Sequence, residues 1–370
     1  MNILWISWKD MSHPAAGGAE IVSDQMCTRF AAEGHTVMML TSRPAGAPEK
    51  SEYNGYTILR MGNRYDVYLK VAQYAKKHLL DWADQVIEEI NTAPFYSQGY
   101  GFTKAKRTLV IYQLAREVWF YQFPPVLSLI GYLLEPLYLL PLGKNDVVTI
   151  SESTRQDLIK HGFDGEKISL MSMGTNVVPL TTLEGTKKQE KPTLFAIGTA
   201  RPMKRGLDQL KAFALAKEKI PDFQFVLGGS LTNPYGEEML KWIEQSGIAD
   251  SIHLVGRISD QEKEAWMAKA HLVTMTSVKE GWGLVVTEAN SQGTPAVVYD
   301  VDGLRDSTRD GETGWVVAPN PQALADGFVE ALTNTEEYEK RRLAAWEWSK
   351  SITFEQGYAD VCSRTINASK

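Results

Sequence analysis

The chain has 370 residues, of which 44% are hydrophobic and 23% are charged, the composition of an ordinary globular protein. Its length suits two domains better than one. The net charge of −6 argues against nucleic-acid binding, and the two cysteines, Cys27 and Cys362, fit neither a metal site nor a disulfide framework. The apolar stretch at the start of the sequence is too short for a signal peptide and is flanked by polar residues. We therefore expect a cytoplasmic protein.

The first half of the chain predicts alternating strands and helices. Residues 3–8 are a nearly continuous apolar run, typical of a parallel strand covered on both faces. A loop at 13–20 precedes a helix that runs to about Glu33, and Gly34 ends it. An extended excursion at 53–61 has a turn at Asn54-Gly55. Further strands are expected at 36–40, 86–90, 109–112, 147–150 and 168–173, with helices at 68–80 and after Ser151.

Residues 123–142 are rich in Leu, Ile and Tyr, but they include four prolines and Glu135, which we expect to break a membrane-spanning helix. We interpret this segment as a helix, a turn and a packing surface. The alternative is a peripheral membrane contact through residues 121–142 at the inner face of the membrane.

Residues 177–191 are polar and lack periodicity, as in a linker. Strands are predicted again at 193–197, 223–227, 253–255, 272–275, 295–298 and 315–317, with helices between them. This alternation predicts two doubly wound parallel sheets. The expected domains are residues 1–176 and 192–351, with a C-terminal helix at about 352–370 that packs back on the first domain.

Residues 279–289 carry two carboxylates, Glu280 and Glu288, around a loop that turns into a helix. Gly281 and Gly283 allow a close backbone approach to a ligand, and the first helical amides, from Leu284, form a natural phosphate seat. Carboxylates accept hydrogen bonds from sugar hydroxyls, so the combination suits a nucleotide sugar. The spacing alone also fits a solvated helix start with an acidic first turn, which the helix dipole favours.

Two other loops follow predicted strands, where ligands bind in open parallel sheets. The loop at 198–206 holds Arg201, Lys204 and Arg205, which could bind a diphosphate or be a solvated basic loop. The loop at 13–20 holds Gly17 and Gly18, whose amides could reach a phosphate or sugar or form a simple turn. It is no Gly-x-Gly-x-x-Gly fingerprint, which argues against a nicotinamide dehydrogenase.

Several longer motifs run through both halves of the chain. They are His13-Pro-Ala-Ala-Gly17-Gly18-Ala-Glu20, Ile90-Asn-Thr-Ala-Pro94-Phe, Gln113-Leu-Ala-Arg116-Glu117-Val-Trp119-Phe120, Gly198-Thr-Ala-Arg201-Pro-Met-Lys204-Arg205-Gly206, Val255-Gly256-Arg257-Ile258-Ser259-Asp260, Glu280-Gly-Trp-Gly-Leu-Val-Val-Thr-Glu288-Ala, Gly293-Thr-Pro295 and Asp310-Gly-Glu-Thr-Gly314. Through them the chain resembles, over nearly its whole length, the retaining glycosyltransferases of family 4. The resemblance implies the GT-B fold, an α/β architecture of two Rossmann-like domains whose parallel sheets face a central cleft.

The resemblance also implies roles for individual residues in a hexosyltransferase that needs no metal and no cofactor. Glu280 would bind the hydroxyls of the donor sugar, and Glu288 those of the ribose. The other donor-binding residues would hold the diphosphate of a UDP- or GDP-sugar or contact its base: Arg201, Lys204 with Arg205 as its alternative, the amides of Gly283 and Leu284, Gly17 and Gly18 from the other domain, and Arg257 and Ile258 at the base.

One position departs from the family pattern. Tyr112 stands before Gln113-Leu-Ala-Arg116, where a subgroup of the family commonly has the active-site His. Tyr112 could donate a hydrogen bond instead, His13 could serve, or the protein could be a weak or inactive homologue. A tyrosine that ends a strand is also commonly a core residue. Arg116 and Glu117 are either acceptor-side groups or solvated charges on a helix.

We therefore expect a retaining glycosyltransferase that moves a sugar from a nucleotide-diphosphate sugar to an acceptor hydroxyl of a glycan or lipid-linked glycan, in cell-surface glycan or glycolipid synthesis. The alternatives are a non-catalytic sugar-nucleotide-binding partner subunit and a GT-B sugar-nucleotide epimerase.

Overall fold

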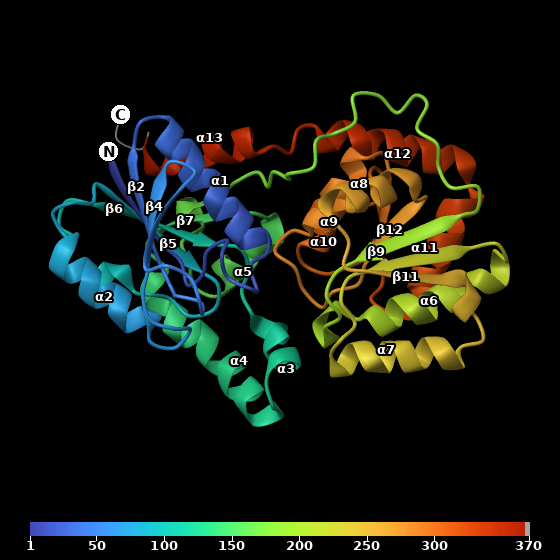
Figure 1. Ribbon diagram of the computed structural model, residues 1–370, viewed down its shortest axis with the longest axis horizontal. Coiled ribbons are helices and arrows are strands. Elements are labelled where there is room, and N and C mark those ends of the chain that lie inside the picture. Colours follow the sequence, from blue (N-terminus) through green and yellow to red (C-terminus); the bar gives the residue numbers. More distant parts are fainter. Residues whose placement is uncertain (367–370) are drawn as a thin grey trace. The chain divides into compact units, whose positions relative to one another are not determined.

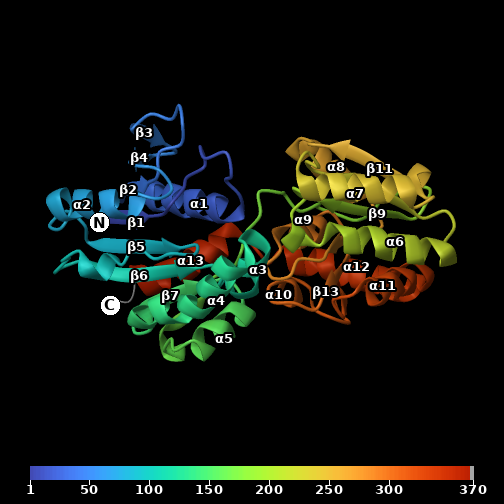
Figure 2. The same ribbon diagram turned by 90° about the horizontal axis from the view of Figure 1, so that it is seen from below.

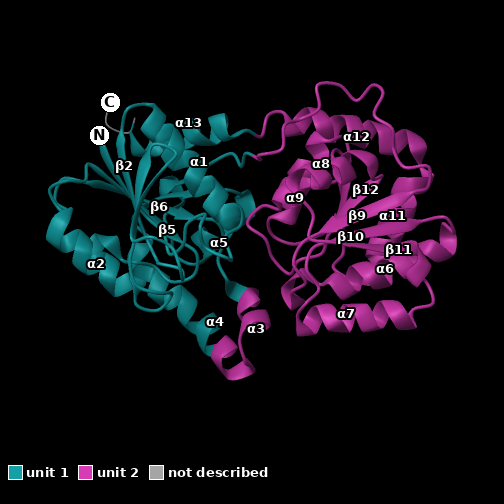
Figure 3. Ribbon diagram, in the orientation of Figure 1, with its two compact units in different colours: residues 1–116, 130–174, 353–370 teal, residues 117–129, 175–352 magenta. Residues whose placement is uncertain are grey.

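The computed structural model describes residues 1–366, and they form two compact units (Figure 3). Unit 1 contains Met1–Arg116, Ile130–Gly174 and the C-terminal residues from Thr353. Unit 2 contains Glu117–Leu129 and Thr175–Ile352. Each unit is built around one sheet with helices on both faces (Figures 1 and 2). Residues 367–370 of the expected C-terminal helix lie outside the described part of the chain.

The sheet of unit 1 has eight strands in the order β3-β4-β2-β1-β5-β6-β7-β8. All neighbours pair in parallel except β3 and β4, a hairpin whose turn residues Asn54 and Gly55 have φ of 47° and 87°. The turn predicted at Asn54-Gly55 is therefore confirmed, and both of its residues are left-handed. The strands are β1 (Asn2–Ile6), β2 (Thr36–Thr41), β3 (Lys50–Tyr53), β4 (Tyr56–Arg60), β5 (Gln85–Ile90), β6 (Lys106–Ile111), β7 (Asp146–Thr149) and β8 (Ile168–Leu170).

Helices cover both faces of this sheet because its central strands are buried on both sides. The helices of unit 1 are α1 (Gly18–Ala32), α2 (Val67–His78), α5 (Glu152–Lys160), α13 (Phe354–Thr365) and, from Ile130 on, α4 (Pro125–Leu139); α3 (Trp119–Gln122) and the start of α4 belong to unit 2. The C-terminal α13 lies beside α1, where Arg29 pairs with Glu355 at 2.6 Å and the rings of Phe30 and Tyr358 are 4.9 Å apart. The C-terminal helix therefore packs on the N-terminal part of the chain, as expected from the sequence.

The sheet of unit 2 is parallel throughout, in the order β11-β10-β9-β12-β13-β14. Alternate residues enter two cores: Leu194 and Phe225 pack with α6, α7 and α11, whereas Phe195 and Val226 pack with α8 and α9. The strands are β9 (Thr193–Ile197), β10 (Gln224–Gly228), β11 (Ile252–Gly256), β12 (Leu272–Met275), β13 (Ala296–Tyr299) and β14 (Gly314–Val317). The helices are α6 (Gly206–Lys219), α7 (Pro234–Gln245), α8 (Asp260–Lys269), α9 (Leu284–Ser291), α10 (Leu304–Ser307), α11 (Pro321–Thr333) and α12 (Thr335–Ser349).

The polar segment 177–191 lies along unit 2 rather than free in solvent. The Leu180 amide donates to Ser291 O at 3.0 Å, and the Gln189 amide donates to Lys269 O at 2.9 Å. The ammonium of Lys188 donates to Ala268 O at 3.0 Å and to Gly293 O at 2.8 Å, and burial lowers its pKa to about 7. The polar groups of this segment, whose composition predicts a linker, therefore also form hydrogen bonds to unit 2.

The apolar segment before β7 forms α4, and its prolines do not interrupt it. Pro125 begins the helix, and Pro136 lies inside it. The expectation that the prolines would break this helix is wrong for Pro136, whereas the α-helix ends at Leu139, before Pro141. Within residues 1–366, Pro125–Leu142 is the one helical stretch that is long and apolar enough to cross a membrane by length and composition, and 22% of it is buried.

Candidate functional site

The order of the sheet in unit 2 reverses between β9 and β12, where ligands bind in folds of this kind. The loop after β9 contains the predicted basic residues, and the loop after β12 leads to Glu280. The two loops are joined: Thr276 Oγ1 donates to Lys204 O at 2.8 Å, and the Val278 amide donates to Met203 O at 2.8 Å. Parallel pairing of β9 with β12 thus brings two sequence-distant motifs together.

The three predicted cations take different positions. Lys204 Nζ forms an ion pair with Glu280 Oε1. Arg205 has a left-handed φ of 51° and points elsewhere, to Pro319 O at 3.1 Å and Asp208 Oδ2 at 2.7 Å. Arg201 is exposed, and among residues 1–366 its guanidinium makes no hydrogen bond or ion pair. Lys204 and Arg201 therefore remain as the cations of this site, whereas Arg205 serves the packing of α6.

Glu280 is held from three directions. Its Oε1 accepts from Ser277 Oγ at 2.5 Å as well as from Lys204. Its amide donates to Asp302 O at 3.0 Å. A Cβ at Gly303 would lie 2.2 Å from Glu280 O, so the close contact requires glycine there. The side chain of Glu280 keeps 16% of its surface exposed, enough for a ligand to reach the carboxylate.

Helix α9 begins directly after Gly283, whose φ is 102°. A Cβ at Gly283 would meet Leu304 Cδ2 at 2.9 Å and Ser307 Oγ at 3.0 Å. The Val286 amide donates to Gly283 O at 2.9 Å, so the amides of Leu284 and Val285 are the ones left at the positive end of the helix dipole. The predicted helix start at Leu284 is confirmed.

Glu288 lies one turn along α9 and is paired with a residue that the sequence did not suggest. Lys263 Nζ, from α8, is 3.0 Å from Glu288 Oε1. Burial raises the pKa of Glu288, and the charge of Lys263 opposes this rise. The carboxylate is 12% exposed and keeps access to solvent.

A cavity of about 200 Å³ joins the two loops of unit 2. It begins at the ends of β9 and β12 and reaches the first turn of α9. Its polar and charged lining residues are Thr199, Arg201, Lys204, Gln209, Thr274, Thr276 and Ser277. Arg257 and Ile258 are not among the lining residues: they follow β11, where Arg257 is exposed and Ile258 packs against the α8–α9 core.

Asp300 and Asp302, which follow β13, form an Asp-x-Asp pair that our reading of the sequence missed. Arg305 pairs with Asp300 at 2.8 Å and with Asp302 at 2.6 Å, and Lys279 pairs with Asp302 at 2.8 Å. Burial would raise the pKa of Asp302, but bonds from Lys279 and Arg305 lower it below its ordinary value. Both carboxylates therefore have cationic partners that fix the loop beside Glu280.

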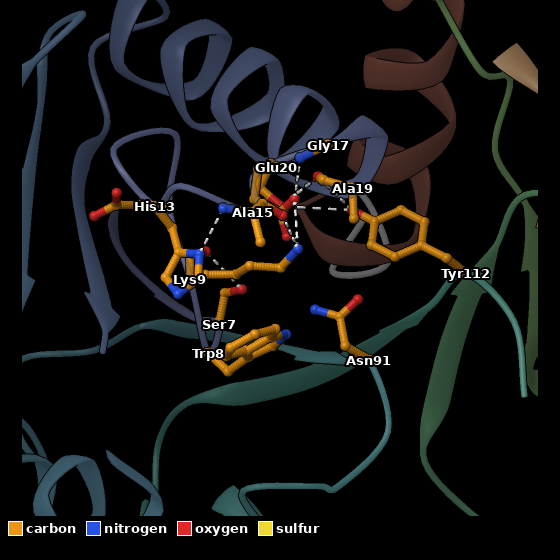
Figure 4. A network of polar contacts seen from close by, with 12 residues as sticks. Ser7, Trp8, Lys9, His13, Ala15, Gly17, Ala19, Glu20, Asn91 and Tyr112 are labelled. Carbon is orange, nitrogen blue, oxygen red and sulfur yellow. Dashed lines mark hydrogen bonds and ion pairs between the residues drawn. The ribbon is translucent and has the colours of Figure 1, made fainter. Parts of the chain in front are cut away.

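The glycine loop of unit 1 is closed by its own side chains (Figure 4). The Gly17 amide donates to Glu20 Oε2 at 2.6 Å, and Lys9 Nζ lies 3.1 Å from the same oxygen. The expected phosphate contact of Gly17 is thus replaced by an internal carboxylate. Gly18 is the first residue of α1, and Glu20 Oε1 is buried without a hydrogen-bond partner.

His13 lies in the same loop, beside Trp8 (Figure 4). Its Nδ1 accepts from the Ala15 amide at 3.0 Å, and its ring centroid is 5.3 Å from that of Trp8. Partial burial lowers the pKa of His13, and the charge of Lys9 adds to this effect. A neutral imidazole with Nδ1 as acceptor carries its proton on Nε2, so His13 can donate one hydrogen bond to a ligand.

Tyr112 follows β6 and points under α1. Its hydroxyl donates to Ala19 O at 3.4 Å and lies 3.5 Å from Ser23 Oγ. Burial raises the pKa of Tyr112 well above its ordinary value. The hydroxyl is therefore used inside unit 1, which agrees with the core-residue alternative rather than with a hydrogen bond to substrate.

The most unusual acid of unit 1, Glu89, was not predicted. It lies in β5 and is 1% exposed. Its Oε2 accepts from Ser23 Oγ at 2.5 Å and from Trp5 Nε1 at 3.3 Å, and its Oε1 accepts from Asn91 Nδ2 at 3.0 Å. Burial raises the pKa of Glu89 to about 7. Two consecutive glutamates inside an otherwise apolar strand are the signal that could have revealed it.

Arg116 has structural partners on α4. It is 8% exposed, its guanidinium donates to Tyr132 O at 2.8 Å, and it lies 3.7 Å from Glu135. The interpretation of Arg116 as a solvated charge is therefore wrong, because the guanidinium is buried and paired on α4, and its acceptor-side role stays a prediction. Glu117 is exposed, as expected for a solvated charge.

Comparison with known proteins agrees with this architecture. Residues 183–348 match the family model described as glycosyl transferases group 1. A curated relative, D-inositol 3-phosphate glycosyltransferase of Paenarthrobacter aurescens, is 28% identical over 233 residues, which are 58% of this chain and 57% of that protein. The matched part of the chain therefore spans little more than half the length of this relative.

Two solved structures resemble the whole chain. Sucrose-phosphate synthase from Thermosynechococcus elongatus has a TM-score of 0.79 and 20% identity, with all of both chains covered. Anabaena Alr3699/HepE, in complex with UDP and glucose, has a TM-score of 0.71 and 15% identity, with 98% of both chains covered. With its two α/β units, the chain thus has the GT-B fold, and its residues 183–348 are similar to the glycosyl transferases group 1 family.

Proposed function

We propose that the chain is a retaining glycosyltransferase that moves a sugar from a UDP- or GDP-sugar to an acceptor hydroxyl. The observation that carries this proposal is a cavity lined by Arg201, Lys204 and the first turn of α9, beside which Glu280 is held by its ion pair with Lys204. Cations and helix amides suit a diphosphate, and a partly exposed carboxylate beside them suits sugar hydroxyls.

The chemistry follows from where charge develops during transfer. When the glycosidic bond to the diphosphate breaks, negative charge grows on the leaving group, and fixed cations and amides stabilise it. Lys204 and Arg201 would hold the diphosphate, Glu280 would orient the sugar, and Glu288 would accept from the ribose hydroxyls. Attack from the same face as the departing diphosphate, which takes the acceptor proton, keeps the anomeric configuration.

The comparisons support parts of this proposal. UDP is bound in the HepE complex, which favours UDP as one of the nucleotides to test. The D-inositol 3-phosphate relative is named as a glycosyltransferase, which favours a hydroxyl acceptor. We infer a cytoplasmic role in the synthesis of a cell-surface glycan or glycolipid.

The test is turnover with a panel of UDP- and GDP-sugars, with and without glycan and lipid-linked acceptors. We expect release of nucleoside diphosphate that depends on an acceptor, and a product whose anomeric configuration, read by NMR, matches the donor. A folded chain that releases no nucleoside diphosphate across the panel would contradict the proposal. Formation of a new sugar or sugar nucleotide without acceptor would instead indicate an epimerase.

The second candidate function is donor binding without catalysis, as a partner subunit. It is favoured by the internal use of the Tyr112 hydroxyl and of the Gly17 amide. Calorimetric binding of a nucleotide sugar with no turnover in any acceptor mixture would support it, whereas acceptor-dependent turnover would remove it.

A further inference from the structure

The exposed apolar side chains of the chain are concentrated in α3 and α4. Of the 21 large hydrophobic residues that are exposed in the described chain, 11 lie between residues 120 and 140. We call this set the α3–α4 surface: Phe120, Tyr121, Phe123, Val126, Leu127, Leu129, Ile130, Leu133, Leu134, Leu137 and Leu140. Apolar exposure concentrated in one short stretch of the chain marks an interaction surface.

Helix α4 has the reverse of the usual amphipathic arrangement. Its buried stripe contains Ser128, Gly131, Glu135 and only one leucine, Leu139, whereas Val126, Leu133 and Leu137 are 71%, 58% and 60% exposed. A helix on the surface of a water-soluble domain normally turns its apolar side inward. The sequence of α4 instead suits a helix whose outer side meets an apolar medium.

The polar groups of α4 are committed to holding the helix in place. Ser128 Oγ donates to Trp119 O at 2.9 Å and to Phe123 O at 2.8 Å, which ties the start of α4 to α3. Glu135 accepts from the amides of Ala115 and Arg116, each at 2.7 Å. The exposed leucines are thus presented by a helix with fixed orientation.

The charge pattern selects the partner. No residue from Val118 to Leu134 carries a charge, and the nearest charges on either side are Glu117 and Glu135. A second copy of the chain or another protein would be expected to meet a polar rim with hydrogen-bonding groups. The α3–α4 surface instead combines aliphatic side chains with aromatic residues, which favours acyl chains and the edge of a bilayer.

The same contacts argue against a helix that crosses the membrane. The stretch Pro125–Leu142 has 18 residues, the shortest length that could cross, but its α-helix has only 15, fewer than the roughly 20 of a typical span. Crossing would also take Glu135 away from the amides of Ala115 and Arg116. We propose that the α3–α4 surface inserts into one leaflet of a lipid bilayer and makes the protein peripheral to the membrane, whatever reaction it catalyses.

The first experiment is flotation of the full chain with phosphatidylcholine vesicles, at 0.1 M and 1 M salt (about 10 and 3 Å of screening length). We expect binding at both salt concentrations, because the surface has no charges to screen. Leu133→Gln with Leu137→Gln should reduce the vesicle partition coefficient at least tenfold. Leu69→Gln with Leu343→Gln is the matched control, since those leucines are 69% and 53% exposed elsewhere, and it should leave partitioning unchanged.

Four results would overturn the proposal. The first is that the folded chain does not float with vesicles, and the second is that binding requires anionic lipid and is lost in 1 M salt. The third is that alkaline carbonate does not extract the protein from the vesicles. The fourth is that the chain is a dimer without vesicles and that the Leu133 and Leu137 substitutions convert it to a monomer. Circular dichroism establishes that the variants are folded. An environment-sensitive dye at Ile130→Cys should shift to the blue with vesicles, and a dye at Leu69→Cys should not; equal responses would also contradict insertion by α4. None of these readouts depends on sugar transfer.

Discussion

The ammonium of Lys204 forms an ion pair with the carboxylate of Glu280, so the cation proposed for the diphosphate neutralises the acid proposed for the sugar. Donor binding has to exchange this pair for a Lys204–phosphate and a Glu280–sugar contact. The two residues are 27% and 16% exposed, so both can reach a ligand from their present positions. Under the proposed function, the pair would therefore couple recognition of the diphosphate to recognition of the sugar.

Replacing Glu280 by Gln should separate binding from turnover. The change removes the partner of Lys204, so affinity for the nucleoside diphosphate should stay within about threefold or improve, while kcat should fall by about 10²-fold or more. Calorimetry with UDP and GDP, together with turnover rates, measures both quantities. Glu244→Gln, an exposed glutamate on α7, is the control and should change neither. A Glu280→Gln variant with normal turnover would remove Glu280 from the site.

Lys263 should control the pH dependence of donor binding through Glu288. Burial raises the pKa of Glu288, so donor affinity should fall as the pH is lowered and the carboxylate becomes protonated. Lys263→Met removes the charge that opposes this rise, so the fall should begin at higher pH than in the unmodified chain. Kd values between pH 5 and 8 test this, with Lys269→Met on the same helix as control. Superimposable curves for Lys263→Met and the unmodified chain would contradict it.

Glu89 should make unit 1 less stable as the pH rises. Its pKa is about 7 in the fold and 4.5 when exposed, so between these values the folded chain keeps a proton that the unfolded chain releases. The linked stability is fully present below pH 4.5 and lost as the pH rises through 7, by roughly 3 kcal/mol.

Glu89→Gln cannot ionise and should lack this loss. Amide hydrogen exchange of β5, corrected for the intrinsic rate, measures the local free energy of opening at pH 5 and 8. The difference between the two pH values should be smaller in the variant by the amount given above. An equal difference in both proteins would show that Glu89 does not hold the proton.

Gly283→Ala should destabilise the fold by more than the strain of a positive φ at residue 283 alone would cause, because the new Cβ would also clash at the start of α9. Gly283 and Gly247 both have positive φ, but only the Cβ at Gly283 would clash, with Leu304 and Ser307. Gly247→Ala should cost about 1 kcal/mol of stability, and Gly283→Ala about 2 kcal/mol more, with weaker diphosphate binding. Thermal melts and calorimetry with UDP and GDP measure both effects. Equal destabilisation by the two substitutions would refute the packing argument.

Much of the fold could be predicted because its strands are local apolar runs. The strands at Thr193–Ile197 and Leu272–Met275 were predicted with their observed bounds. The turn at Asn54-Gly55 and the helix after Ser151 follow from residues whose preferences act over a few positions, and Ser151 Oγ accepts from the Thr154 amide as a helix cap does. Such signals need no knowledge of the tertiary structure.

The parts that could not be predicted depend on distant partners. The pairing of Glu288 with Lys263 and the burial of Glu89 beside Trp5 join residues that only the folded sheet brings together. The outward-facing leucines of α4 were not predicted. The prolines and leucines of this segment indicate its composition but not which side of the helix faces outward. The occupied amide of Gly17 was different: Glu20 lies three residues later, the spacing of a helix cap, and the sequence contained that signal.

Calorimetric titration with UDP and GDP tests the central claim most directly, namely that the ends of β9 and β12 form a nucleoside diphosphate site. We predict one-site binding of at least one nucleotide, weakened at least tenfold by Lys204→Met and by Arg201→Ala. Lys241→Met, an exposed lysine on α7, should leave the affinity unchanged. Absence of binding to the folded chain, or equal affinity in all of these variants, would contradict the account.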